Sequence, residues 1–282
     1  MLEEGEARMP AMNDEPITAI VSNIQSSPKY RSLCVYTVQR IAVEEWARHG
    51  TLKRAIQATR SRLHQIYSAY ESPIDYGRAY RSLQAAYAAQ SPEGIQGTCC
   101  DLLSLHASTR ERLPIVGRFY KQIFAHTGRP RSLLDLACGL GPLSWPWMGL
   151  DEGTLYDAYD IDAERVAFLN RFFALAGMRA AQAHLQDMLC DPPLQRADVA
   201  LLLKSSTCLE RQKKGSTLAL LDALDVRHVV VTFPVKSLGR REKGMVAQYE
   251  RTFYAMVSGR PWPVTRLDFA SELTFIVCKE RS

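Results

Sequence analysis

The spacing of apolar residues changes at Arg129-Pro130, and this change constrains the fold of the chain more than any other feature. From residue 17 to about residue 131, apolar residues recur at helical spacing, and no convincing strand interrupts them. Beyond that point, short apolar runs alternate with helical stretches, which is typical of a mostly parallel sheet covered by helices on both faces. We therefore predict an all-α N-terminal region followed by an α/β domain.

The expected strands lie at residues 132–137, 154–160, 181–185, 199–204, 228–234, 264–270 and 272–278. The last two runs are nearly contiguous, so they should form an antiparallel hairpin at the edge of the sheet. We expect residues 1–16 to be a disordered tail and residues 17–105 to form a helical N-terminal domain. Residues 106–282 should then form a Rossmann-like α/β domain.

The composition is that of an ordinary soluble globular protein, with 46% hydrophobic and 23% charged residues. No apolar run is long enough to span a bilayer, and the acidic, polar N-terminus is neither a signal peptide nor a transit peptide. The cysteines form no CxxC pair, so we expect reduced thiols in a cytoplasmic protein that binds neither a metal nor an iron–sulfur cluster.

The segment Leu-Leu-Asp-Leu-Ala-Cys-Gly-Leu-Gly-Pro, at residues 133–142, carries the strongest chemical signal. An apolar strand runs into Asp135 and then into a small-residue turn, where the backbone must approach a ligand closely. A nicotinamide-binding turn would have the pattern GxGxxG and would hold a pyrophosphate. Here a carboxylate precedes the glycines and Pro142 replaces a third glycine. Asp135 would repel a pyrophosphate but suits the ammonium of S-adenosylmethionine; a turn without ligand is the alternative.

Polar residues also end the next two expected strands. Asp160 ends the second, where a carboxylate can accept hydrogen bonds from a ribose diol. Gln186, Asp187 and Met188 end the third, where an oxygen can accept from the adenine amine and Met188 can pack against the ring. Each residue alone is equally compatible with a solvated loop. Together with Asp135, these strand ends favour a site for S-adenosylmethionine.

The fourth expected strand ends at Lys204 and is followed by Ser-Ser-Thr. Methyltransferases that attack exocyclic amines tend to have a (D/N/S)PP(Y/F) turn at this place. Its absence fits a target such as a ring nitrogen with a free lone pair, for which no general base is needed and the enzyme only aligns the reactants. Lys204 or Arg211 could then hold the RNA backbone or the base edge, although Lys204 could equally extend to solvent.

Two basic segments are candidate RNA-binding surfaces in a chain of net charge +5. One lies on the early helices and the other at residues 236–245, after the fifth expected strand. Clusters of Lys and Arg neutralise phosphates. The alternative for each segment is an ordinary solvated surface.

Several distinctive segments resemble a known family, the aminoglycoside-resistance methyltransferases that modify N7 of a guanine in 16S rRNA. The matching pieces lie at residues 29–34, 37–40, 62–64, 69–70, 105–113, 134–140, 185–187, 209–211, 233–239 and 244–245, with Lys204 and Tyr249. His-Ala-Ser-Thr-Arg-Glu-Arg-Leu at 106–113 and Phe-Pro-Val-Lys-Ser-Leu-Gly at 233–239 are far more specific than the cofactor turn. The resemblance extends over nearly the whole chain from about residue 17.

This resemblance implies methyl transfer from S-adenosylmethionine to N7 of guanine 1405 in the decoding A site of the 30S subunit, which confers aminoglycoside resistance. It implies a helical N-terminal domain that binds rRNA, a flipped target base, and a monomer that needs no membrane and no metal. The implied cofactor residues are His106, Arg112, Asp135, Ala137, Gly139, Asp160, Ile161, Gln186, Asp187 and Met188. The implied residues that position the RNA are Lys204, Arg211, Lys236, Arg241 and Met245, and those that bind it are Lys29, Arg31, Arg40, Lys53, Arg54, Arg60, Arg62 and His64.

Two departures from the family pattern stand out. The chain has Gly141 where the family usually has Asn, and it has Ser-Ser-Thr-Cys at 205–208 where the family tends to have apolar residues and a proline. The second departure leaves open how the base is seated. Two alternative functions also stay open. One is an rRNA methyltransferase that acts at another position, such as adenine N1, and the other is a non-catalytic ribosome-binding protein of the same fold.

Overall fold

The computed structural model describes residues 15–68, 74–235 and 244–279. The chain divides into two compact units, Met1–Tyr67 and Ser68–Ser282. Among the described residues, no helix is long and apolar enough to cross a membrane.

The first unit is helical, as the spacing of its apolar residues predicts. It contains α1 (Glu15–Gln25), α2 (Val35–His49) and α3 (Leu52–Leu63), followed by one π-helical turn, η1 (His64–Ser68). Gly50 ends α2 in the left-handed conformation, with φ of 61°, and its N–H bonds to the carbonyl of Trp46. Such a glycine ends a helix at little steric cost. Apolar side chains such as Ile20, Ile41 and Leu63 form the buried interior.

A buried carboxylate ties α2 to α3. Glu45 is almost fully buried, and its Oε1 accepts a hydrogen bond of 2.8 Å from Nη1 of Arg62. Arg48 and His49 approach the same carboxylate at 3.2 and 3.4 Å. The more exposed Glu44 also accepts from Arg62, at 2.5 Å. Arg62 is therefore part of the internal structure of this unit.

The second unit begins with helices and continues as a sheet. Its helices before the sheet are α4 (Tyr76–Ala88), α5 (Pro92–Leu103), α6 (Ala107–Arg112), η2 (Leu113–Ile115) and α7 (Val116–Thr127). Its strands are β1 (Ser132–Leu136), β2 (Leu155–Asp160), β3 (Ala181–Leu185), β4 (Ala197–Leu203), β5 (Val226–Pro234), β6 (Val264–Asp268) and β7 (Glu272–Cys278). Between them lie η3 (Gly141–Ser144), α8 (Trp145–Met148), α9 (Ala163–Leu175), α10 (Ser206–Gln212), α11 (Ser216–Ala223) and α12 (Met245–Val257).

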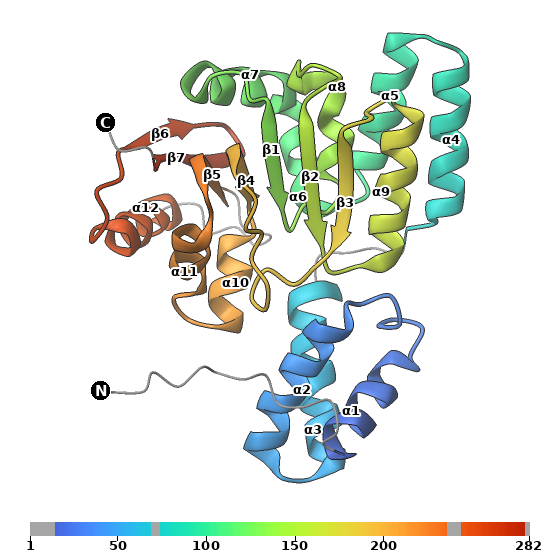
Figure 1. The fold of residues 1–282 in the computed structure, drawn as a ribbon, viewed down its shortest axis with the longest axis vertical. Helices are drawn as coiled ribbons and strands as arrows, with labels where there is room; N and C mark the ends of the chain where they lie inside the picture. The colour runs from blue at the N-terminus through green and yellow to red at the C-terminus, as the bar shows by residue number, and fades with distance from the viewer. Residues whose placement is uncertain (1–14, 69–73, 236–243, 280–282) are drawn as a thin grey trace. The chain divides into compact units, whose positions relative to one another are not determined.

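The strand order is β3-β2-β1-β4-β5-β7-β6. The strands β1 to β5 are parallel, whereas β7 pairs antiparallel with both β5 and β6. The predicted Rossmann-like sheet and its C-terminal hairpin are therefore confirmed (Figure 1). Because the strand order reverses between β1 and β4, a crevice for a ligand is expected at the carboxyl ends of these strands.

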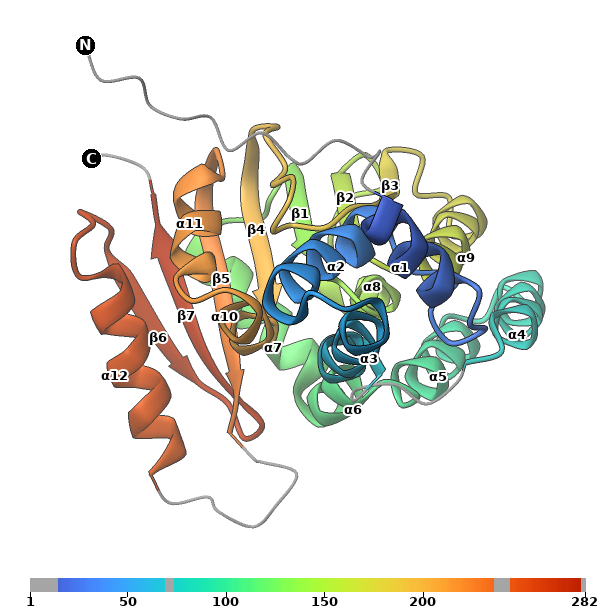
Figure 2. The same cartoon turned by 90° about the horizontal axis from the view of Figure 1, so that it is seen from below.

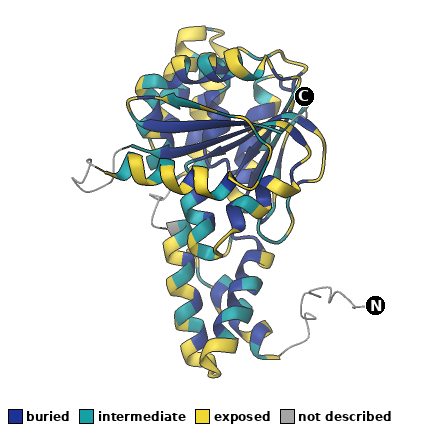
Figure 3. Ribbon diagram, turned by 90° about the vertical axis from the view of Figure 1, so that its left-hand side faces the viewer, coloured by how far each residue is buried: buried dark blue, intermediate teal, exposed yellow. Residues whose placement is uncertain are grey.

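Most residues of the central strands are buried (Figure 3), and their apolar side chains belong to two separate cores. One core joins β1 and β2 to α7 and α9, with Phe119 and Phe172 at its centre. The other joins the opposite face to α11 and α12, where the rings of Phe253 and Phe275 stack 4.3 Å apart. Strands β1 and β4 contribute to both cores, which explains why they are almost continuously apolar.

The division between the two units falls well before residue 105, where the sequence predicts the domain boundary. The reason is that both helices pack with the α/β unit, α4 against α9 and α5 against α4 and η3 (Figures 1 and 2). The ring of Tyr76 on α4 contacts Phe168 on α9, with centroids 5.1 Å apart, and Leu83 is buried in the core that α9 covers. Helical periodicity alone does not reveal which partner a helix packs against.

Loss of the buried carboxylate should destabilise the first unit. We expect Glu45→Ala to cost about 3 kcal/mol, because it leaves a half-buried Arg62 without its buried partner. Glu44→Ala removes the more exposed partner of the same arginine and should cost less than about 1 kcal/mol. Hydrogen exchange of amides in residues 15–67 measures both changes. Equal protection in the two variants would contradict this role for Glu45.

Candidate functional site

The turn after β1 brings the backbone to the carboxyl edge of the sheet. Ala137 and Gly139 both adopt left-handed conformations, with φ of 51° and 55°. A Cβ added to Gly139 would lie 3.5 Å from the ring of His106, and the N–H of Gly139 donates to Oδ2 of Asp160 at 3.0 Å. A left-handed alanine is strained. A turn of this kind presents backbone groups closely to whatever binds beside it.

Asp135 lies beneath this turn and is fully buried. The hydroxyl of Tyr156 donates to its Oδ2 at 2.7 Å, and burial raises the pKa of Asp135 to about 7. A Cβ added to Gly141 would lie 3.0 Å from the same Oδ2. A larger residue at position 141 would therefore have to displace the Asp135 carboxyl. This is a physical reason why the chain has glycine here, where the family usually has Asn.

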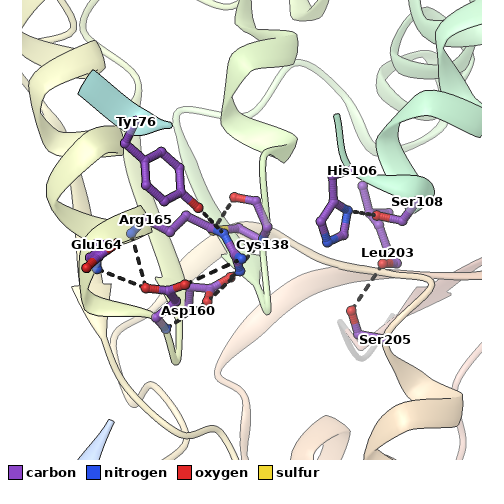
Figure 4. Close-up of polar contacts among 11 residues, drawn as sticks. Tyr76, His106, Ser108, Cys138, Asp160, Glu164, Arg165, Leu203 and Ser205 are labelled. Atoms are coloured by element: carbon purple, nitrogen blue, oxygen red, sulfur yellow. Dashed lines mark hydrogen bonds and ion pairs between the residues drawn. The ribbon is translucent and has the colours of Figure 1, made fainter. Parts of the chain in front are cut away.

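Asp160 ends β2 beside the same turn and is also buried (Figure 4). Its oxygens accept from the N–H of Gly139 and, at 3.0 Å, from the N–H of Asp162. Nη1 of Arg165 donates to both oxygens at 2.9 Å. Burial raises the pKa of Asp160 to about 7, while the bonds from the two backbone amides oppose the rise. The side chain of Ile161 is partly exposed next to this carboxylate.

His106 lies across the turn from this cluster, immediately before the first residue of α6 (Figure 4). Its Nδ1 is 2.9 Å from the hydroxyl of Ser108. Burial, together with the positive charges of Arg112, Arg110 and Lys204, lowers the pKa of His106 to about 4. The imidazole is therefore neutral at physiological pH.

A network of alternating charges lies at the same edge of the sheet. Arg112 is 3% exposed, and its Nε lies 2.7 Å from Oε1 of Glu272, which is fully buried at the start of β7. Lys204 follows β4 in a left-handed conformation with φ of 60°, and its side chain is 6% exposed. Its Nζ lies 2.8 Å from Glu111 and 3.4 Å from Glu272. The ammonium of Lys204 is thus held inside the protein by two carboxylates.

The prediction from sequence omitted both glutamates of this network. Glu272 is separated from Arg112 by 160 positions in the chain, so no local spacing connects them. The available signal was the single charged residue at the start of Glu-Leu-Thr-Phe-Ile-Val-Cys, an otherwise apolar strand. A charge at such a place needs a buried partner.

The residues after β3 divide between the surface and the core. Gln186 is partly exposed and donates to the carbonyl of Asp191 at 2.7 Å. Asp187 is buried and accepts from the N–H of Leu189 at 2.9 Å, which shapes the turn. Met188 is buried in the core that α11 and α12 cover. Contact of these residues with an adenine ring stays a prediction.

The predicted RNA-positioning residues lie on different elements. Arg211 is exposed on α10, and Met245 is the partly buried first residue of α12. Lys236 and Arg241 lie outside the described residues.

The predicted RNA-binding residues of the first unit fall into two groups. Arg40 and Arg62 are partly buried and form ion pairs with Glu44. The exposed members are Lys29, Arg31, Lys53, Arg54, Arg60 and His64. Two of these also contact other side chains, since Arg60 donates to Asn23 at 3.0 Å and Nζ of Lys29 lies 3.2 Å from His64. The exposed group places positive charge at the surface, whereas Arg40 and Arg62 also pair with a carboxylate of the same unit. RNA contact of both groups stays a prediction.

No group of three or more His, Cys, Asp or Glu side chains that could hold a metal ion occurs among residues 15–68, 74–235 and 244–279.

The close approach of Gly141 to Asp135 leads to a stability prediction. We expect Gly141→Ala to destabilise the protein by about 1–2 kcal/mol, because the new methyl group displaces Asp135 from its hydrogen bond with Tyr156. In a Tyr156→Phe background, which already lacks that bond, the same substitution should cost about 1 kcal/mol less. Gly97→Ala on α5 meets nothing within 4 Å and serves as the control in urea unfolding. Additive effects of the two substitutions would contradict this explanation.

Comparison with known proteins identifies the family of the chain. Residues 26–276 match the family model described as ribosomal RNA methyltransferase (FmrO). A 16S rRNA (guanine(1405)-N(7))-methyltransferase of Micromonospora echinospora is 38% identical over 94% of this chain and 98% of its own length. A relative of the same name from Serratia marcescens is 40% identical over 84% of this chain and 88% of its own length.

The solved structures agree with these relatives. The 16S rRNA methyltransferase RmtF, in complex with S-adenosyl-L-homocysteine, has a TM-score of 0.79 and 34% identity, covering 95% of this chain and 99% of that one. The 16S rRNA methylase RmtB has a TM-score of 0.74 and 32% identity, covering 94% and 98%. The chain that folds into this sheet, with its turn between Asp135 and Asp160, belongs to the ribosomal RNA methyltransferase (FmrO) family.

Proposed function

We propose that this protein transfers a methyl group from S-adenosylmethionine to N7 of guanine 1405 of 16S rRNA and thereby confers aminoglycoside resistance. The main support for this function is the hydrogen bond from the N–H of Gly139 to the buried Asp160 carboxylate, at the place where a methyl donor would bind. The chain also matches the family model over residues 26–276.

The residues at the carboxyl edge of the sheet fit this methyl donor. The left-handed turn from Ala137 to Gly139 leaves room for close approach, and Asp160 offers carboxylate oxygens to a ribose diol. Ile161 offers an apolar surface for a base beside that carboxylate. When bound, S-adenosylmethionine supplies an electrophilic methyl group on a positively charged sulfur.

The buried cation Arg112 is the group proposed to hold the methionine carboxylate. Its Glu272 partner fixes the guanidinium at one edge, and the ring of Phe119 lies 5.0 Å below it. His106, neutral and packed over Gly139, would line the same end of the site. Asp135 lies behind the turn and contributes negative charge from within the protein when it is ionised.

Methylation of guanine N7 needs no general base, because this nitrogen carries its own lone pair. The protein therefore contributes alignment of the nucleophile, the methyl carbon and the sulfur along one line. A base inside an rRNA helix is not accessible to the methyl group, so the guanine must be flipped out. Lys204, rigidly held between Glu111 and Glu272, belongs to the wall against which the base would be positioned, together with Arg211 and Met245.

The proposed partner is the 16S rRNA within the 30S subunit, bound by a monomer without a metal. The exposed cations of the first unit, on α3 and in the segment before α2, provide positive charge for phosphates. These contacts would position the enzyme on the RNA, whereas residues at the sheet edge would select the base.

Removal of the Asp160 carboxylate should weaken binding of the cofactor. We expect Asp160→Ala to cost about 1.5–3 kcal/mol of S-adenosylhomocysteine affinity in calorimetry, because charge-assisted bonds to the ribose are lost. Asp157→Ala is the control, since Asp157 lies on the same strand but pairs with His184 at 2.7 Å. Unchanged affinity in Asp160→Ala would remove this residue from the site.

Charge reversal on α3 should weaken docking to the ribosomal subunit. Lys53 and Arg54 are exposed near the start of this helix, and we expect their double reversal to Glu to lower 30S affinity at least about tenfold and to reduce its salt dependence. The control is the double variant Arg131→Glu/Arg179→Glu, which makes the same charge change. These two exposed arginines precede β1 and β3, at the amino ends of the strands, so their reversal should have little effect. Filter binding at several salt concentrations makes the comparison. Equal losses in the two double variants would show a nonspecific charge effect.

A further inference from the structure

The carboxylate of Asp160 accepts hydrogen bonds from the guanidinium of Arg165, on the helix that follows β2. Nη1 of Arg165, on the first turn of α9, lies 2.9 Å from each of its oxygens. Nε of Arg165 donates to the hydroxyl of Tyr76 on α4 at 3.3 Å, and Nη2 lies 3.7 Å from Asp162. The side chain of Arg165 is 4% exposed. Its position is therefore fixed by α4, β2 and its own helix (Figure 4).

We infer that Arg165 is a positioning residue for the methyl donor, which holds the Asp160 carboxylate ionised and oriented to accept from the ribose hydroxyls. This inference rests on the proposed function, and it adds a residue that none of the sequence motifs includes. Arg165 would act through Asp160, because the contacts of its guanidinium lie with protein groups.

Burial and the acidic groups around Asp160 oppose its ionised form, and the positive charge of Arg165 offsets them. Burial, together with the negative charge of Asp162 at the N-cap of α9, raises the pKa of Asp160 to about 7. Asp135 on β1 and Cys138 in the turn are further acidic groups that interact with Asp160, and Tyr76 from α4 adds a phenol. The amides of Gly139 and Asp162 favour the ionised form. Arg165 adds a full positive charge at hydrogen-bonding distance, which favours that form further.

The guanidinium of Arg165 could act in two ways, and its removal would change the affinity for the methyl donor in opposite directions. The amides of Gly139 and Asp162 each occupy one acceptor position, on Oδ2 and Oδ1 respectively, and Arg165 spans both oxygens. A ribose diol must therefore share the carboxylate with Arg165. If Arg165 supports the ionised carboxylate, its removal weakens binding. If it instead blocked the position of the ribose, its removal would tighten binding.

Calorimetric titration of the full-length protein with S-adenosylhomocysteine, between about pH 6 and 8.5, tests the inference. We expect Arg165→Met to weaken binding about tenfold or more near neutral pH. The wild-type affinity should fall as the pH drops through about 7, because Asp160 takes up a proton. In Arg165→Met this fall should begin at higher pH, since the carboxyl has lost its cation. Arg165→Lys keeps the charge and should recover part of the affinity and the wild-type pH dependence.

The matched control is Arg171→Met. Arg171 lies on the same helix and also contacts α4, with its guanidinium 3.6 Å from the ring centroid of Tyr80, but it is exposed. The control should bind S-adenosylhomocysteine like the wild type at every pH. A loss equal to that of Arg165→Met would show that any weakening of the contact between α9 and α4 affects the site, and it would overturn the specific role of Arg165.

Tyr76→Phe provides a second test that does not remove a buried charge. It deletes the hydroxyl that holds Nε of Arg165 and keeps the ring on Phe168, so about two- to fivefold weaker binding is expected. Circular dichroism and thermal unfolding establish which variants are folded. Wild-type or tighter affinity in folded Arg165→Met, or in Tyr76→Phe if Arg165→Met does not fold, overturns the inference. A wild-type protein that binds no S-adenosylhomocysteine would instead contradict the proposed function itself.

Discussion

The burial of charge at the carboxyl edge of the sheet is the constraint on which the rest of the site depends. The side chains of Asp160, Arg112, Glu272 and Lys204 are all at least nine-tenths buried, and an isolated charge in such surroundings would be very costly. Each is paired: Asp160 with Arg165, and Glu272 with both Arg112 and Lys204. The elements that meet at this edge are consequently held in one arrangement by charge as well as by packing.

This constraint explains why the site is built from several distant parts of the chain. The sheet brings the ends of β1, β2 and β4 to one edge, α6 supplies Arg112, and the hairpin returns Glu272 to the same place. Paired and hydrogen-bonded side chains are pre-organised, so little reorganisation is needed when a ligand arrives. The proposed chemistry suits such a site, because methyl transfer to a ring nitrogen depends on alignment.

Much of the fold could be predicted because its signals are local. Most strands are short segments rich in apolar residues, and Asp160 is the last residue of β2, so its place in the fold could be predicted from the sequence alone. The pairing of Glu272 with Arg112 could not, since it depends on tertiary structure across 160 positions. Arg165 resembles any basic residue on a helix until the fold places it against Asp160. Likewise, the ion pairs of Arg62 with two glutamates could not be predicted, because charge counted along a helix does not reveal ion pairs. Contact of Arg62 with RNA stays a prediction.

Mapping the methylated nucleotide tests the central claim most directly. Purified 30S subunits would be incubated with the protein and S-adenosylmethionine, and 7-methylguanosine would be located by chemical cleavage at the modified base followed by reverse transcription. We expect one new signal, at guanine 1405, which requires both the protein and the methyl donor. Methylation of an adenine or of an exocyclic amine, or no methylation by a protein that still binds the subunit, would contradict it.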